Sequence, residues 1–328
     1  DSQGCTFGFF DYCRQLFYIP NPIPPANDVS TCEDINHPLL GAITEEEVDS
    51  ALNRMKSRAP GVSGFSPSDL KYVRTAIAKP LSLIFSNFLD TASFYSEWLI
   101  SSIFFIFKGK GERTDPNNYR SISIHDPFAK VFSSVLTTRL STFAENNNLL
   151  PKYQFGFRSK RSTVAAAALL HEVVKTRLDK KQRTYVAYID FKKAFDRVQR
   201  PLLFHKLLLL GIPSRFCSTL NHIFSMTKYV IQNGDFYSQP YFSNIGVPQG
   251  DPISPILFNL FISDLPSYLG HQGVTLNGVK ISYIQYADDL CIIGESPEDL
   301  QHGLNNLAAY CKINYIDINV SKTKIQVF

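Results

Sequence analysis

The sequence predicts an α+β fold with a large hydrophobic core. Of its 328 residues, 44% are hydrophobic and 13% aromatic, whereas 19% are charged. This composition excludes an intrinsically disordered chain, which combines low hydrophobicity with high charge. Segments with helical spacing are separated by short apolar runs, and two of these runs together have the pattern of a hairpin. Helices with irregularly placed strands and a hairpin favour an α+β fold over a regular strand–helix–strand array.

The first element expected after an irregular N-terminal segment is a capped helix. Residues 1–42 show no helical or strand period, and four prolines crowd into residues 20–25. We therefore expect residues 1–42 to form an extended N-terminal arm. Thr44 followed by Glu47 is a capping box, which marks the start of a helix. The apolar spacing that follows predicts this helix over 44–57.

The remaining elements follow from apolar spacing and from the turn residues between them. Residues 68–90 have helical spacing, and we expect a break near Pro80 because proline removes a helical hydrogen bond. Residues 280–294 are expected to form a hairpin joined through Asp288 and Asp289. Further helices are predicted over 126–142, 161–178, 201–210, 213–225, 254–265 and 297–311, and strands over 100–107, over 185–189 and at the end of the chain.

Charge, hydropathy and cysteine spacing limit the class of protein. A net charge of +4 permits a nucleic-acid or phosphate partner without requiring one. The most apolar run, residues 98–107, is much shorter than the roughly 20 residues of a membrane span. None of the six cysteines has the C-x-x-C spacing of a zinc site. We expect reduced thiols in an intracellular protein of the nucleus or the cytoplasm, with no visible targeting signal and no membrane association.

Three aspartates stand out as candidate ligands of a divalent cation. Asp190 ends the apolar strand 185–189, and Asp288 and Asp289 lie at the tip of the predicted hairpin. Two unit charges about 4 Å apart repel each other by roughly 4 kcal/mol at an effective dielectric constant near 20. If folding joins the three carboxylates, they need a divalent cation, and oxygen ligands suit Mg²⁺.

The simpler interpretation of these aspartates is structural. An isolated Asp-Asp pair is usually an exposed turn, and Asp190 could merely end its strand. Hairpin tips, however, usually carry Gly or Asn. An acidic pair between apolar strands therefore favours the cation site.

Several sequence strings resemble those of a known enzyme family. DFKKAFD, GVPQGDPISPILFNLFISDL and YADD occur in this order and resemble the palm of reverse transcriptases. Upstream, FKGKGERTDPNNYRSISI and QFGFRSKRST resemble the fingers motifs of LINE-type (non-LTR) retrotransposon polymerases. The resemblance extends from about Ile43 to Phe328. It implies a right-hand polymerase fold of fingers and palm, in which an antiparallel palm sheet carries the YADD hairpin and packs on helices.

The resemblance also implies a function, a cofactor and partners. The chain would be an RNA-directed DNA polymerase that transfers nucleotides with two Mg²⁺ ions, for which Mn²⁺ can substitute. Residues 1–42 would be an N-terminal extension, 43–183 the fingers and 184–328 the palm, and the thumb would be absent. The partners would be an RNA template, a DNA primer and dNTPs, with adjoining endonuclease and thumb regions in a longer polyprotein.

Family positions assign roles around the three aspartates. In the family, the aspartates matching Asp190 and Asp288 hold both metal ions, and the one matching Asp289 completes the cluster. The resemblance implies that the backbone carbonyl at Phe191 is a further metal ligand beside the nucleotide. Phe195 matches the aromatic residue that walls off the sugar 2′ position, although without the motif a core aromatic would be the simpler interpretation.

Other family positions imply contacts with the nucleotide and the template. Lysines and arginines of the loop 108–118 and its neighbourhood would bind the triphosphate, although a solvated basic loop is the alternative. The implied nucleotide-binding residues are Lys108, Lys110, Arg120 and Gln249, with Arg113 in the same loop. The implied template-binding residues are Arg58, Arg158, Lys160, Arg161, Gly246 and Gly250. Lys322 corresponds to a lysine of a late palm motif.

Some positions depart from the family pattern, and two alternatives stay open. Ser121 replaces a usual proline, and Asp251 is expected to add a negative charge near the template strand. An RNA-directed RNA polymerase shares the palm, but Phe195 and a YADD sequence in place of GDD argue against it. A domesticated or degenerate RNA-binding scaffold without catalysis is the other alternative, which the three intact aspartates disfavour.

Overall fold

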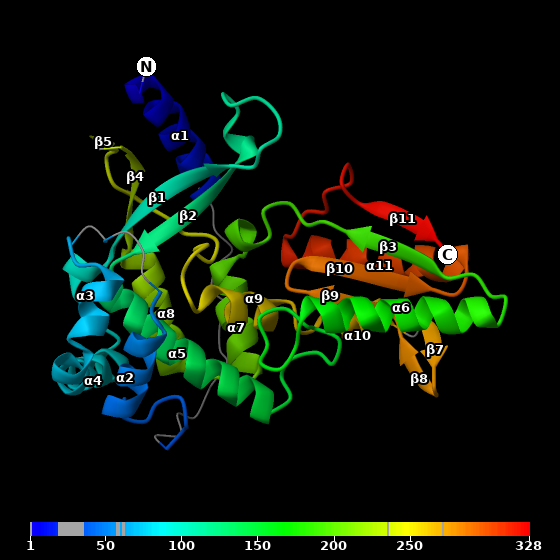
Figure 1. The fold of residues 1–328 in the computed structure, drawn as a ribbon, viewed down its shortest axis with the longest axis horizontal. Coiled ribbons are helices and arrows are strands. Elements are labelled where there is room, and N and C mark those ends of the chain that lie inside the picture. Colours follow the sequence, from blue (N-terminus) through cyan, green and yellow to red (C-terminus); the bar gives the residue numbers. More distant parts are fainter. Residues whose placement is uncertain (1, 19–35, 57–59, 61–62, 235, 271) are drawn as a thin grey trace. The chain divides into compact units, whose positions relative to one another are not determined.

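The computed structural model describes residues 2–18, 36–56, 60, 63–234, 236–270 and 272–328. The chain forms two compact units (Figure 1). The first unit consists of Asp1–Phe143 and Gln199–Ser254, and the second of Ala144–Val198 and Pro255–Phe328. Both contain helices and antiparallel strands, which confirms the predicted α+β class. None of the helices in the described parts of the chain is long and apolar enough to cross a membrane.

The first unit is organised around a five-stranded sheet. Strand β1 (Ile100–Phe107) pairs antiparallel with β2 (Tyr119–His125) and parallel with β4 (Lys228–Asn233). The short strands β5 (Phe236–Tyr237) and β6 (Tyr241–Phe242) both pair with β4. Figure 1 shows β1 and β2 as a long hairpin, whose connection contains the short helix η2 (Pro116–Asn118). The predicted strand over 100–107 is confirmed.

The N-terminal residues that the structure describes form a helix, which differs from the prediction. Residues Ser2–Phe17 form helix α1, where an extended arm was expected. Phe9 and Cys13 lie four residues apart on one face of this helix and pack against Ile103 of β1 and Tyr229 of β4. Burial of this apolar face stabilises the helix. In the sequence, the apolar spacing of this face extends over only two neighbouring turns. The proline-rich segment lies outside the described residues.

Helices complete the first unit, and the break predicted in one of them lies elsewhere. The capping box at Thr44 is confirmed and starts α2 (Glu45–Arg54). Helix α4 (Arg74–Thr91) continues through Pro80, and the interruption lies instead at Val73, after α3 (Pro67–Tyr72). Burial of one face of α4, including Phe85 and Phe88, outweighs the missing hydrogen bond at Pro80. The other helices are η1 (Ser96–Trp98), α5 (Pro127–Asn146), α7 (Arg200–Leu209) and α8 (Ser214–Met226).

The second unit contains a four-stranded antiparallel sheet between two helices. Its strand order is β11 (Lys324–Val327), β3 (Tyr185–Ile189), β10 (Asp289–Gly294) and β9 (Tyr283–Tyr286). Successive side chains of a strand point to opposite faces. Ile293 packs with Val173 of α6 (Thr163–Asp179), whereas Ile292 meets Gly303 of α11 (Pro297–Asn314). The two helices therefore cover opposite faces of the sheet (Figure 1).

Several bounds in the second unit differ from prediction. The hairpin spans Tyr283–Gly294, and its turn is Ala287–Asp288, because Asp289 already pairs with Tyr286. The helix predicted over 254–265 divides into α9 (Ser254–Phe261) and α10 (Leu265–Leu269). Pro266 suits the first turn of a new helix but not a helix interior. The unit also contains η3 (Phe195–Arg197) and a small hairpin of β7 (Val274–Leu276) and β8 (Val279–Ile281).

Candidate active site

Asp190 is held at the end of strand β3 by the chain segment before β11. Its backbone carbonyl accepts a hydrogen bond of 2.7 Å from the Asn319 N–H. Its carboxylate oxygen Oδ2 accepts a second, of 2.8 Å, from the Asn319 side-chain amide. The Lys322 ammonium lies 3.6 Å from the same oxygen, and the Asp190 side chain is 35% exposed. Asp190 is thus fixed by two bonds from one residue, and its carboxylate remains accessible.

The strand register brings the YADD turn to Asp190. In the antiparallel pairing of β10 with β3, Leu290 lies opposite Ile189. The next position in this register places Asp289 opposite Asp190, and Asp288 precedes it in the turn. Sheet formation therefore brings Asp190 to the YADD turn, although Asp190 and Asp288 are 98 residues apart in the sequence.

The electrostatics of this cluster disfavour its negative charge. Burial raises the pKa of the Asp288 carboxyl, and the charges of Asp289 and Asp190 raise it further, against a hydrogen bond from its own backbone N–H. Burial and the charge of Asp190 also raise the pKa of Asp289. A nearby cation would reverse both effects, because an opposite charge favours the ionised carboxylate.

The donor set fits a hard divalent cation. Carboxylate oxygens, and a backbone carbonyl such as that of Phe191, are the ligands that Mg²⁺ prefers. In the described parts of the chain, no group of three or more His, Cys, Asp or Glu side chains is already arranged to hold a metal ion.

Two aromatic residues follow Asp190. Phe191 is buried and forms an isolated bridge with Ile318. Phe195 begins η3, is half-buried, and stacks on Phe258 of α9 with 4.7 Å between ring centroids. One side of the Phe195 ring is thus fixed by packing.

The basic residues of the QFGFRSKRST string differ in how far they are free to bind a ligand. Arg158 forms a bidentate pair with Glu145, at 2.8 and 2.6 Å, and also donates to the Pro151 carbonyl. The Arg161 guanidinium lies over the Phe155 ring, 5.4 Å from its centroid. Lys160 is exposed. Arg158 thus has a structural role within the second unit, whereas Lys160 is open to solvent.

In the first unit, the basic residues predicted to bind the nucleotide lie on the β1–β2 hairpin. Arg120 is an exposed residue of β2, opposite Ile106 of β1. Lys108 donates a hydrogen bond of 2.7 Å to the Asn117 carbonyl, and Lys110 is exposed. Arg113 lies over the Phe107 ring, 5.5 Å from its centroid. Arg58 lies outside the described residues.

The GVPQG loop is attached to strand β2 through backbone contacts. The Gln249 carbonyl accepts a hydrogen bond of 2.7 Å from the Ser123 N–H. Gly250 has φ +113°, and a Cβ at this position would lie 2.5 Å from the Ser123 carbonyl oxygen. Only glycine allows this close approach of two backbones. Gly246 has φ +79°, and its carbonyl accepts a bond of 2.8 Å from the buried Arg200 guanidinium.

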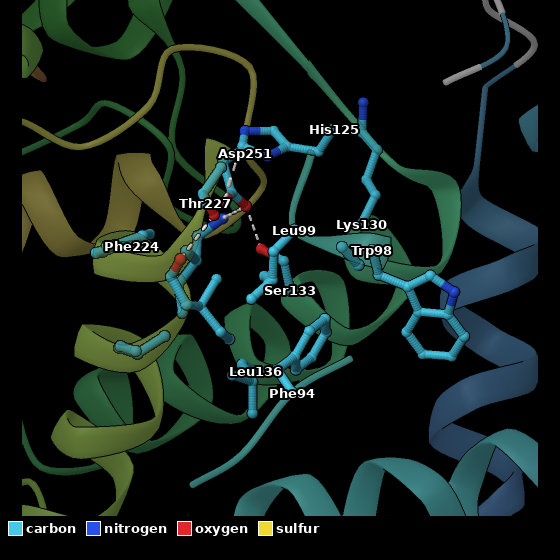
Figure 2. A pocket seen from close by; sticks show the side chains of 14 residues that line it. Phe94, Trp98, Leu99, His125, Lys130, Ser133, Leu136, Phe224, Thr227 and Asp251 are labelled. Atoms are coloured by element: carbon cyan, nitrogen blue, oxygen red, sulfur yellow. Dashed lines mark hydrogen bonds and ion pairs between the residues drawn. The ribbon is translucent and has the colours of Figure 1, made fainter. Parts of the chain in front are cut away.

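Asp251, which is expected to add a negative charge near the template strand, is mostly buried within the first unit. Figure 2 shows its carboxylate pointing to Ser133, whose hydroxyl donates a hydrogen bond to it, and to His125. The His125 Nε2 atom lies 3.9 Å away, and burial lowers the pKa of His125. Asp251 is 7% exposed and lines a small pocket with Trp98 and Phe224. The Asp251 side chain therefore belongs to the interior of the first unit.

Comparison with known proteins identifies the family. Residues 108–327 match the family described as reverse transcriptase (RNA-dependent DNA polymerase). The chain belongs to the reverse transcriptase family. The match includes all three aspartates of the cluster and both strands that carry them. It confirms the resemblance on which the sequence analysis relied.

Known relatives of this reverse transcriptase come from mobile elements. It is 28% identical over 292 residues to "Probable RNA-directed DNA polymerase from transposon BS" of Drosophila melanogaster, covering 87% of this chain and 32% of that one. It is 30% identical over 266 residues to "RNA-directed DNA polymerase from mobile element jockey" of the same species, covering 78% and 28%. The chain thus spans about a third or less of the length of these relatives. Such relatives support the LINE-type branch of the family.

A solved structure supports the fold. The reverse transcriptase chain resembles apo telomerase from Candida tropicalis truncated from its C-terminal domain, with a TM-score of 0.50 and 15% sequence identity. The likeness covers 80% of this chain and 56% of that chain. It confirms the right-hand polymerase fold that the sequence strings imply.

Two residues that position the site of this reverse transcriptase are not among those predicted from the sequence. Asn319 binds Asp190 through both backbone and side chain. Arg200 holds the GVPQG loop through the Gly246 carbonyl. Asn319 lies in the NVSKTK string, in which Lys322 is the residue that matches a family position, and Arg200 has the sequence context of an ordinary helix start. A signal for Asn319 was available, because Asn, Ser and Thr together favour a local turn.

Proposed function

We propose that this chain is the fingers and palm of an RNA-directed DNA polymerase from a LINE-type element. The observation that carries the proposal is the register that sets Asp289 opposite Asp190, with Asp288 in the adjoining turn. The proposed division is an N-terminal extension over 1–42, fingers over 43–183 and palm over 184–328. Its substrates would be an RNA template, a DNA primer and dNTPs, and endonuclease and thumb regions would belong to the longer polyprotein.

The proposed reaction is nucleotidyl transfer. The primer 3′-hydroxyl attacks the α-phosphate of the dNTP in line, a new phosphodiester bond forms, and pyrophosphate leaves. Asp190, Asp288 and Asp289, with the Phe191 carbonyl, would hold two Mg²⁺ ions, or Mn²⁺ in their place. The ions supply charge stabilisation for the attacking and leaving oxygens. The carboxylates themselves orient the site, and Asn319 keeps Asp190 in place.

The remaining candidate residues divide between nucleotide and template. We assign Lys108, Lys110 and Arg120 to the triphosphate, because all three are exposed cations on one hairpin. Gln249 and Phe195 would lie beside the incoming nucleotide. The residues assigned to the template are Arg58, Arg158, Lys160, Arg161, Gly246 and Gly250, of which Arg158 would act through the loop that it stabilises.

A matrix of templates and nucleotides tests the proposal. The chain is mixed in excess with RNA or DNA templates annealed to a DNA primer, and single-nucleotide addition is measured with dNTPs or rNTPs in Mg²⁺ and in EDTA. We expect Mg²⁺-dependent addition of dNTPs on RNA. Preference for rNTPs would indicate an RNA polymerase, and tight RNA binding without any addition would indicate a scaffold. Either result would overturn the proposal.

Replacement of Arg120 should impair use of the nucleotide. Arg120→Ala removes an exposed guanidinium assigned to the triphosphate, and we expect kcat/KM for dNTP to fall about 10²–10³-fold, the loss typical of one preorganised donor. Template affinity should barely change. Steady-state addition and a gel-shift titration measure the two quantities. Arg74→Ala, which removes a cation from α4 in the same unit, is the matched control. Weaker template binding with unchanged dNTP kinetics would contradict the assignment.

Replacement of Phe195 should admit ribonucleotides. A side chain that clashes with a 2′-hydroxyl penalises the wrong substrate and adds little to the right one. Phe195→Val should therefore lower the KM for rNTPs and keep dNTP addition within about tenfold, or roughly 1.4 kcal/mol. Phe258→Leu weakens the same ring stack from its buried side and serves as the control. If both variants lower the melting temperature and leave the dGTP-to-GTP ratio of kcat/KM unchanged, Phe195 is a core residue.

A further inference from the structure

The YADD turn has a backbone conformation that needs support. Ala287, the second residue of YADD, has φ +56°, in the left-handed region that residues other than glycine seldom adopt. Ala287 is 2% exposed, so water does not reach its backbone polar groups freely. Such conformations persist where surrounding contacts hold them. The contacts that fix the Ala287 backbone therefore also fix the backbone position of Asp288, the next residue.

The side chain of Gln154 supplies these contacts. Gln154 is completely buried, and its Oε1 atom accepts hydrogen bonds from the Ala287 N–H at 2.9 Å and the Gly156 N–H at 2.8 Å. Its Nε2 atom lies 3.5 Å from the Ala287 carbonyl, which also accepts a bond of 3.0 Å from Gln285. Both backbone polar groups of Ala287 are thus paired with buried amide side chains.

The segment around Gln154 is itself fixed against the hairpin. The Phe155 N–H donates to the Gln285 carbonyl at 2.8 Å, and the Gln285 N–H donates to the Tyr153 carbonyl at 2.9 Å. A Cβ on Gly156 would lie 2.3 Å from the Ala287 nitrogen, so only glycine permits this approach. The Gly156 carbonyl in turn accepts a bond of 2.8 Å from Asn259 of α9. The segment that carries Gln154 is therefore itself held in place against the hairpin by backbone contacts.

We infer that Gln154 is a positioning residue for the YADD turn and, through Ala287, for Asp288. The inference rests on the proposed function, in which Asp288 is a catalytic ligand. Two features of the Gln154 side chain suit this role. Its Oε1 atom accepts hydrogen bonds from two backbone N–H groups, and its Nε2 atom lies beside the Ala287 carbonyl. Met has a similar volume without these groups, whereas Glu keeps the acceptor.

Hydrogen exchange tests whether Gln154 holds the turn. In Gln154→Met the Ala287 amide loses its acceptor, and we expect peptides covering 284–290 to exchange at least about tenfold faster than in the wild type. Gln301→Met, at an exposed position of α11, should leave this exchange unchanged. This measurement does not depend on polymerase activity. Unchanged exchange in Gln154→Met would overturn the inference.

Kinetics test whether the turn positions the catalytic acid. A small misplacement of a reacting group can cost about 10²-fold, so kcat of Gln154→Met should fall by 10–100-fold while KM for dNTP stays within about threefold. Gln154→Glu keeps the acceptor and, because burial favours the protonated carboxyl, also keeps a donor, so it should recover kcat to within about tenfold of the wild type. An equal kcat in Gln154→Met, or a rise in KM in place of the fall in kcat, would overturn the positioning role. Absence of nucleotide addition by the wild type would count against the proposed function alone, and hydrogen exchange would still decide whether Gln154 holds the turn.

Discussion

Asp288→Asn is expected to abolish nucleotide addition and yet to stabilise the protein in the absence of divalent cations. The activity should fall on the order of 10³-fold or more, which is at or beyond the upper end of the loss for removing one preorganised hydrogen-bond donor. The substitution keeps the shape of the side chain and removes a charge from a cluster of acids. Single-nucleotide addition on an RNA template measures the loss, and a melting curve in EDTA measures the stability.

The opposite sign of the two effects follows from the surroundings of Asp288. Burial raises the pKa of Asp288, and so do the charges of Asp289 and Asp190, which means that folding disfavours its ionised form. Asn has no such penalty, so the melting temperature should rise. Asp190 has Asn319 and Lys322 as partners, and Asp190→Asn should lose the activity without this gain in stability.

The control for this prediction is an acid outside the cluster. Asp179 is exposed at the end of α6, and Asp179→Asn should change neither the activity nor the melting temperature appreciably. If Asp288→Asn retains more than a tenth of the wild-type activity, the assignment of Asp288 is wrong. A lowered melting temperature together with lost activity would instead indicate damage to the fold.

Arg200→Met should destabilise the first unit strongly. The Arg200 side chain is 4% exposed, and its guanidinium donates to the carbonyls of Gly246, Ser243 and Phe224 at 2.8, 2.5 and 3.1 Å. It also lies over the Phe224 ring, 5.3 Å from the centroid. Met fills a similar volume but leaves three carbonyl oxygens without this donor. Each such group costs about 1–3 kcal/mol.

The expected loss is about 3–5 kcal/mol, because relief from burying the Arg200 charge offsets part of the cost. Burial lowers the pKa of Arg200, which is consistent with such a cost. Urea unfolding at equilibrium measures the difference. Arg74→Met is the control, since Arg74 forms a partly exposed pair with Asp49 that is worth at most about 1 kcal/mol. A loss below about 1 kcal/mol for Arg200→Met would mean that water replaces the guanidinium.

Local signals in the sequence predicted the elements that carry the candidate acids. The apolar run before Asp190 and the acidic pair after Tyr286 mark strand ends, whichever strands they pair with. The capping box at Thr44 is likewise a local structure. The strings around them then identified the family, and the family implied the pairing of the strands. Neither composition nor spacing alone could have set the register between β3 and β10.

The features that escaped prediction depend on partners far along the chain. Helix α1 is stabilised by strands about a hundred or more residues away, and strand β2 has ordinary composition until β1 pairs with it. Gln154 lies in a string whose basic residues are the ones that match family positions, and its role becomes visible only when Ala287 is beside it. The ion pair of Arg158 with Glu145 likewise becomes visible only in the folded structure, and the template contact of Arg158 stays a prediction.

The most direct test of the account is whether the aspartate cluster binds divalent cations as one site. The chain, with primer, RNA template and dNTP, is titrated with Mn²⁺, and the free ion is measured by electron paramagnetic resonance. The account predicts saturable binding in the wild type and an affinity at least tenfold weaker in Asp288→Asn, with the wild-type value retained in Asp179→Asn. Equal Mn²⁺ affinity in the wild type and in Asp288→Asn would contradict it.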